Sequence, residues 1–183
     1  LRHFQNGRDV DAEKLAASVT QEFPKHPFAW KVLGAVLGAT CHKSEAVDAN
    51  QTAVALSPQD AEAHNNLGNT LQELGKLEEA NASFRQAIVL KPDFAEAHNN
   101  LGVALNEQGK QKEGIESYEI ALAIDPNYAE AHENLSYALL NKGNLSQGFD
   151  EYELRWQTPK GMRKKRNFSQ LIWDGRASLK NKR

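Results

Sequence analysis

The 183-residue sequence has a single cysteine and no long apolar run, and each absence excludes a class of protein. Cys41 cannot form a disulfide within the chain, which excludes a small disulfide-stabilised fold. No stretch reaches the ~18 consecutive apolar residues of a transmembrane helix, so we expect no membrane partner. No charged segment followed by an apolar one opens the chain, so we expect a cytoplasmic protein, although the chain begins at Leu1 and not at a methionine.

The chain as a whole is nearly neutral, but its two parts carry opposite net charges. The sequence contains 22 lysines and arginines and 24 acidic residues, a net charge of −2. Residues 159–183 contain nine of the basic residues and one acid, Asp174, so the preceding residues are acidic. We predict an ordered array over 1–158 and a basic linker or tail over 159–183, which can begin a downstream domain. No RNA-binding motif accompanies the basic run at 163–166, so we expect no nucleic acid partner.

The sequence repeats itself every 34 residues. The octamer AEAHNNLG begins at Ala61 and returns unchanged at Ala95, and a degraded copy begins at Ala129. Within each unit, positions 4, 7, 8 and 11 recur as one helix face, and positions 20, 24 and 27 recur as another. Glycine at position 15 ends the first helix, and proline at position 32 ends the second. The sequence therefore predicts two antiparallel helices in each unit.

This pattern of small residues at 8 and 20, an aromatic residue at 24 and proline at 32 resembles the tetratricopeptide repeat family. The resemblance implies an all-α fold, a right-handed superhelical solenoid of antiparallel helix pairs. It predicts a partial repeat followed by four repeats, with these bounds: 1–26, 27–60, 61–94, 95–128 and 129–158.

Histidine replaces the family's tryptophan at position 4 in three units, as His64, His98 and His132. Residues 34 apart in stacked helix pairs lie about 20 Å from each other, so these histidines cannot share a metal ion. We expect them to fill the tryptophan's place in the packing. The sequence shows no phosphate-binding glycine loop and no Ser-His-Asp grouping, so we expect no catalysis, cofactor or metal in this chain.

The segment that contains Trp156, Phe168 and Trp173 resembles the junction at which bacterial proteins of this family pass into a glycosyltransferase-like domain. That resemblance implies a chain cut from a larger enzyme, with the catalytic domain absent.

The first helices of such arrays line a concave groove through positions 2, 5, 6, 9, 12 and 13. Asparagine is a mediocre helix former, so its recurrence at positions 5 and 6 needs a reason. A binding role and a recent duplication that copied every residue both explain it. The candidate peptide-binding residues are Asn65, Asn66, Asn69, Glu96, Asn99, Asn100, Val103, Glu130, Asn134 and Tyr137.

The family resemblance makes the binding role more specific. In peptide-binding members, asparagines at position 6 form a row that binds the backbone of an extended peptide. Asn66, Asn100 and Asn134 occupy this position, and Val32 interrupts the row. Other members bind a terminal carboxylate through basic residues, but Glu130 and Asn134 disfavour that mode here. We predict a non-catalytic protein- or peptide-binding module. The alternatives are the substrate-recruiting part of a glycosyltransferase-like protein and a self-associating scaffold.

Overall fold

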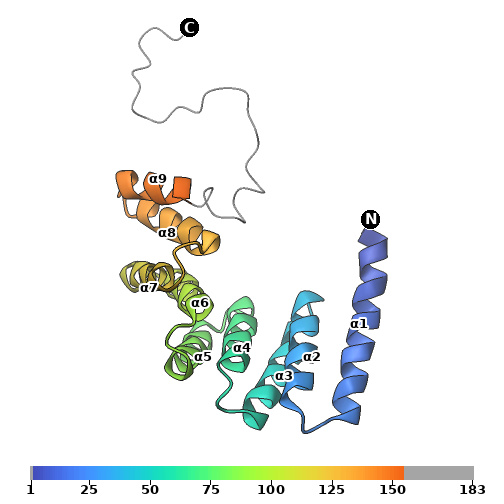
Figure 1. Cartoon of the computed structure of the whole chain (residues 1–183). Coiled ribbons are helices and arrows are strands. Elements are labelled where there is room, and N and C mark those ends of the chain that lie inside the picture. Colours follow the sequence, from blue (N-terminus) through green and yellow to red (C-terminus); the bar gives the residue numbers. More distant parts are fainter. Residues whose placement is uncertain (1, 155–183) are drawn as a thin grey trace.

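The computed structural model describes residues 2–154, and their side chains from Val10 onward. The described residues form nine α-helices and no strand. The helices are α1 (Arg2–Glu22), α2 (Pro27–Ala39), α3 (Lys43–Leu56), α4 (Ala61–Glu73), α5 (Leu77–Leu90), α6 (Ala95–Glu107), α7 (Gln111–Ile124), α8 (Ala129–Asn141) and α9 (Leu145–Leu154). Consecutive helices pair and the pairs stack into an arc, with α1 and α9 at its two ends (Figure 1). The all-α solenoid that the family resemblance implies is confirmed.

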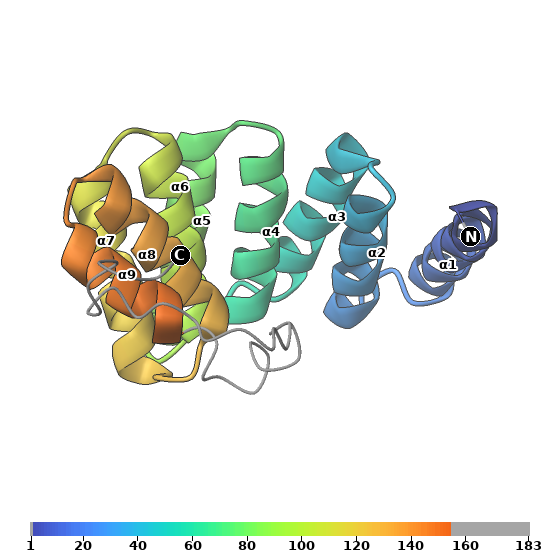
Figure 2. The ribbon, with the colours of Figure 1, turned by 90° about the horizontal axis from the view of Figure 1, so that it is seen from above.

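The view from above shows the pairs α2–α3, α4–α5, α6–α7 and α8–α9 in succession, with α1 alone at one end (Figure 2). Helix α2 contacts α4, α4 contacts α6, and α6 contacts α8. Among the described helices, no comparable contact joins α3, α5, α7 and α9 to one another. The first helix of each pair therefore lies on the inner side of the arc.

The core lies between successive pairs and is made by the positions that recur every 34 residues. Its largest cluster joins α3, α4, α5 and α6 around Phe84, which is fully buried. A second cluster joins α7 and α8 around Tyr118 and Leu135. Two glycines bring α6 and α7 together: a methyl group on Gly114 would lie 3.0 Å from the carbonyl oxygen of Gly102 and 2.5 Å from Asn106 Oδ1. The mid-helix glycines are thus required by close packing.

The turns inside the helix pairs follow one rule with one exception. Gly75, Gly109 and Gly143 all adopt positive φ angles, of 74°, 77° and 86°. Cys41 occupies the same position in the α2–α3 turn and also has a positive φ, of 66°. A side chain strains this left-handed conformation, which glycine adopts readily. The thiol of Cys41 is exposed and free.

The histidines at position 4 make the same contact as the tryptophan that they replace. Trp30 Nε1 donates to the carbonyl oxygen of Pro24 at 2.9 Å. The Nε2 atoms of His64, His98 and His132 lie 3.0, 3.1 and 3.0 Å from the carbonyl oxygens of Pro58, Pro92 and Pro126. Each ring therefore ties a first helix to the proline that ends the helix before it. Among the described residues there is no group of three His, Cys, Asp or Glu side chains that could bind a metal ion.

The predicted basic tail (159–183) and the segment from Trp156 to Trp173 lie outside the described residues. The boundary at residue 158 and the junction with a further domain therefore stay predictions. In the part of the chain that the structure describes, no helix is long and apolar enough to cross a membrane.

Candidate peptide-binding groove

The position-5 and position-6 asparagines on the inner helices α4, α6 and α8 connect neighbouring repeats. Asn65 Nδ2 donates to Glu96 Oε1 at 3.0 Å. Because a carboxylate can only accept, this contact fixes the orientation of the Asn65 amide and turns its oxygen toward Asn100. Asn100 Nδ2 then donates to Asn65 Oδ1 at 3.1 Å and to Asn69 Oδ1 at 2.9 Å. One acidic side chain thus sets the direction of a chain of amides from α4 to α6.

The next pair of inner helices repeats the central bond. Asn134 Nδ2 donates to Asn99 Oδ1 at 2.9 Å. Asn65 and Asn99 are fully buried, whereas Asn66, Asn100 and Asn134 are half-buried. A row that binds a peptide backbone is expected to present solvent-exposed amides at position 6. Instead, Asn100 and Asn134 direct N–H groups sideways into the protein.

The N-terminal end of this face is built differently. Val32 offers no amide, and Asn66 makes no side-chain hydrogen bond to any described residue. Lys31 instead contacts Asp60 at 2.9 Å and Glu62 at 3.0 Å. Partial burial opposes ionisation of Asp60, but its hydrogen bonds to Lys31 and to the Ala63 N–H lower its pKa overall. An ionic contact therefore takes the place of the amide bond between α2 and α4.

The remaining candidate residues on these helices are more accessible to solvent than Asn65 and Asn99. Glu96 and Glu130 are exposed, and Val103 is half-buried. Tyr137 is 49% exposed, and its hydroxyl donates to Glu133 Oε1 at 3.3 Å. The pKa of Tyr128 is raised, first by burial and then by the charges of Glu130 and Glu96. The carboxylates of Glu96 and Glu130 therefore lie close enough to this tyrosine to disfavour its ionisation.

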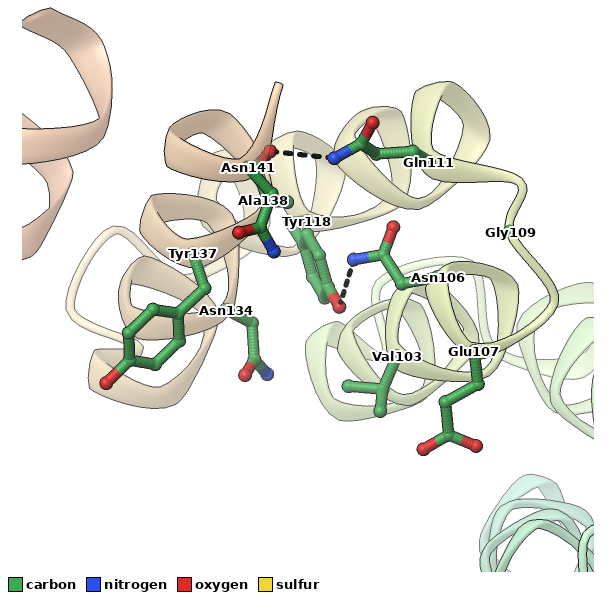
Figure 3. A pocket seen from close by; sticks show the side chains of 10 residues that line it. All are labelled: Val103, Asn106, Glu107, Gly109, Gln111, Tyr118, Asn134, Tyr137, Ala138 and Asn141. Carbon is green, nitrogen blue, oxygen red and sulfur yellow. Dashed lines mark hydrogen bonds between the residues drawn. The ribbon is translucent and has the colours of Figure 1, made fainter. Parts of the chain in front are cut away.

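A pocket of about 370 Å³ opens between α6, α7 and α8 (Figure 3). It brings together three of the predicted site residues, Val103, Asn134 and Tyr137. The other predicted residues lie on the inner helices outside this pocket. The pocket is completed by Asn106, Glu107, Gly109, Gln111, Tyr118, Ala138 and Asn141.

Two hydrogen bonds define the inner wall of the pocket. Asn106 Nδ2 donates to the Tyr118 hydroxyl at 3.1 Å, and Gln111 Nε2 donates to the Ala138 carbonyl oxygen at 3.1 Å (Figure 3). Burial raises the pKa of Tyr118 to about 12; the hydrogen bond from Asn106 opposes this shift, and the charge of Glu107 adds to it. Negative potential therefore reaches the interior of the pocket.

Sequence reasoning placed Asn106, Glu107 and Asn141 on the inner face but did not select them as site residues. It placed Tyr118 in the core, where its ring lies. The signal that could have found the pocket is the change at position 12 from Gln72 to the shorter Asn106, which bonds to Tyr118 and not to the next repeat.

The comparisons with known proteins agree with this geometry. A family model described as tetratricopeptide repeat matches residues 65–129, and another, described as TPR repeat, matches residues 44–75. Over 79 residues, 43% of the chain, the sequence is 34% identical to UDP-N-acetylglucosamine–peptide N-acetylglucosaminyltransferase of Caenorhabditis elegans. The match spans 7% of that protein's length.

Solved structures share the fold at lower identity. MamA from Desulfovibrio magneticus RS-1 is similar with a TM-score of 0.73 and 18% identity, over 91% of this chain and 92% of that one. PilF of Pseudomonas aeruginosa is similar with a TM-score of 0.75 and 22% identity, over 86% of this chain and 72% of that one. Stacked helix pairs with an inner face of recurring side chains define a helical-repeat solenoid. The chain belongs to the tetratricopeptide repeat family.

Proposed function

We propose that the chain is a non-catalytic module that binds a protein segment or extended peptide along the inner face of α4, α6 and α8. The observation that carries the proposal is the direction of the amides. Asn100 uses both side-chain N–H groups within the protein, whereas its carbonyl oxygen accepts no hydrogen bond from a described residue. The carbonyl oxygen of Asn134 is likewise without a described donor.

These oxygens and the neighbouring carboxylates make the face rich in acceptors. The backbone of an extended peptide presents N–H groups at regular intervals, which suit a row of acceptors repeated from helix to helix. Such contacts bind the peptide without reading its side chains. Glu96 and Glu130 add a preference for basic or neutral peptides.

The test selects ligands from a displayed library of random decapeptides and titrates the selected peptides by fluorescence anisotropy. Asn66→Ala is the sharpest variant, because Asn66 makes no side-chain hydrogen bond to a described residue and its loss spares the bonds between repeats. We expect it to weaken binding about twofold to tenfold, as for one lost hydrogen bond. Gln86→Ala on the outer helix α5 removes an exposed amide elsewhere and is the matched control.

Equal binding by wild type, Asn66→Ala and Asn134→Ala would mean that the asparagine row is a relic of duplication. Selection of no peptide at all would equally contradict the proposal. Thermal melts of each variant separate lost contacts from lost folding.

The C. elegans relative favours one narrower function, a substrate-recruiting arm of a larger glycosyltransferase-like protein. The test is transfer of N-acetylglucosamine by the product of the complete gene, with and without this array. A gene that encodes no further domain would overturn this function and leave peptide binding intact.

Exposed apolar side chains at the two ends of the array favour self-association as a separate function. Phe28 lies near one end, and Leu145 and Phe149 lie on α9 at the other. Light scattering over a dilution series distinguishes an oligomer from a monomer that binds peptides.

A further inference from the structure

The pocket between α6, α7 and α8 carries an inference about which ligand side chain it accepts. Figure 3 shows Tyr137, Asn134, Val103 and Glu107 extending to the same side of the helices, with Tyr137 and Glu107 at opposite ends of the row. Val103 offers an apolar wall, Tyr137 an exposed aromatic ring and Glu107 a carboxylate. A ligand side chain with an apolar stem and a polar head would match these apolar and polar surfaces.

Two groups at the pocket have oxygen atoms that accept no hydrogen bond from a described residue. Glu107 Oε1 accepts one hydrogen bond, from Gln72 Nε2 at 3.0 Å, and Oε2 accepts none from a described residue. Asn134 has already used one N–H group on Asn99, and its carbonyl oxygen has no described donor. Glu133 adds a second carboxylate at the tyrosine end, in contact with the Tyr137 hydroxyl. These groups favour a ligand that donates hydrogen bonds.

The charged groups around the pocket further restrict which ligand side chains it can accept. No lysine or arginine lines the pocket, although Lys110 and Lys142 each follow a lining residue in the sequence. Glu107 lines the pocket and places a carboxylate there; burial raises the pKa of the Tyr118 hydroxyl, and the charge of Glu107 adds to that shift. An anionic side chain would be repelled here, and a purely aliphatic one would leave the acceptors unpaired.

We propose that this pocket binds a lysine or arginine side chain of an extended peptide, an inference that rests on the proposed function of the inner face. The aliphatic stem packs on Val103, and the cationic head pairs with Glu107. Backbone contacts to the asparagine row supply binding, and this pocket supplies selectivity for a basic side chain.

The experiment uses the full chain and fluorescein-labelled decapeptides of alanine, glycine and serine with a single central Lys, Arg, Leu, Gln or Glu. We expect the Lys and Arg peptides to bind about fivefold to tenfold more tightly than the Leu and Gln peptides, and the Glu peptide to bind least. The advantage should shrink as sodium chloride rises from about 50 mM to about 500 mM, because salt screens the charge pair.

Variants assign the effect to the pocket. Glu107→Gln should remove most of the preference for Lys and Arg, whereas Glu119→Gln, which removes an exposed charge from α7, should preserve it. Equal affinity for the Lys, Leu and Glu peptides would overturn the pocket assignment, and so would an unchanged preference in Glu107→Gln.

The two proposals fail in different ways. If all the peptides bind equally well and Asn66→Ala weakens each of them, the inner face binds peptides and only the pocket assignment is wrong. If no peptide binds wild-type protein, both proposals are wrong.

Discussion

The inner face has two equivalent grooves, one between α4 and α6 and one between α6 and α8, built from residues 34 apart. Side chains close the first groove and leave the second open. Four side-chain hydrogen bonds join α4 to α6, and they include those from Asn100 to Asn69 at 2.9 Å and from Gln72 to Glu107 at 3.0 Å. In the second groove, the residue equivalent to Asn69 is Val103, which cannot accept a hydrogen bond.

The second bridge is also missing from the α6–α8 groove. Asn106, equivalent to Gln72, turns to the Tyr118 hydroxyl instead of crossing to Asn141. Phe84 has no hydroxyl at the equivalent position, so the earlier repeat offers no such partner. Two side chains per repeat therefore decide whether the same backbone arrangement is bridged or forms a pocket.

The largest expected effect compares the two aromatic residues at position 24, Phe84 behind the α4–α6 groove and Tyr118 behind the α6–α8 groove. Phe84→Ala should lower the free energy of unfolding by about 3–5 kcal/mol, because it empties a fully buried site. Tyr118→Phe keeps the ring and removes only the hydroxyl that accepts from Asn106, so it should cost about 0.5–1.5 kcal/mol. Urea denaturation measures both. Similar losses would show that the Tyr118 hydroxyl contributes as much as a whole buried ring.

Alkaline pH should act on Tyr118 behind the open groove and not on Phe84 behind the closed one. Burial raises the Tyr118 pKa to about 12, above the value of about 10 in an unfolded chain. Stability is therefore complete below pH ~10 and falls as pH rises toward 12, because the unfolded chain releases its proton first. The loss should reach about 2 kcal/mol.

Urea denaturation at pH 9, 10.5 and 12 measures this alkaline loss. Tyr118→Phe should reduce it without abolishing it, because the pKa of Tyr128 is also raised. A loss of the same size in Tyr118→Phe would contradict the assignment, and Tyr128→Phe is the matched control.

Exchanging position 9 between the grooves tests the bridges directly. Asn69→Val should cost about 0.5–1.5 kcal/mol, since Asn100 loses one of its two acceptors. Val103→Asn supplies a second acceptor for Asn134, beside Asn99, and should narrow the pocket, which weakens binding of a basic peptide. Amide NMR of Asn100 and Asn134 follows both bonds. Unchanged Asn134 signals in Val103→Asn would show that side-chain identity at position 9 does not close the groove.

The smallest expected effect concerns a turn outside both grooves. Cys41 has a positive φ where Gly75 and Gly109 have one without a side chain. Cys41→Gly should therefore raise the free energy of unfolding by about 0.5–1 kcal/mol, the relief of backbone strain less the entropy that glycine loses. Gly109→Ala is the reciprocal control and should destabilise. A loss of stability in Cys41→Gly would mean that the thiol makes a contact worth more than the strain.

The fold was predictable because local spacing determines it. Helix faces, turn glycines and terminal prolines all act within 34 residues, so the sequence of each unit is enough to predict its helix pair. The candidate groove was predictable as a face but not in its contacts. Spacing places Asn65 and Asn100 on that face, but the direction of their amides depends on Glu96 in the next repeat. The Asn106–Tyr118 bond could not be foreseen because it joins two helices whose separation is set by Gly102 and Gly114.

The replacement of an amide bond by Lys31 between α2 and α4 makes the array respond unevenly to ionic strength. Salt screens the attraction of Lys31 for Asp60 and Glu62, whereas the neutral bonds from Asn100 to Asn65 and from Asn134 to Asn99 carry no net charge to screen. Raising the salt concentration should therefore loosen the first junction before the junction of α6 with α8. The curvature of the array at its N-terminal end should therefore change with salt concentration, whereas the curvature around the α6–α8 pocket should not.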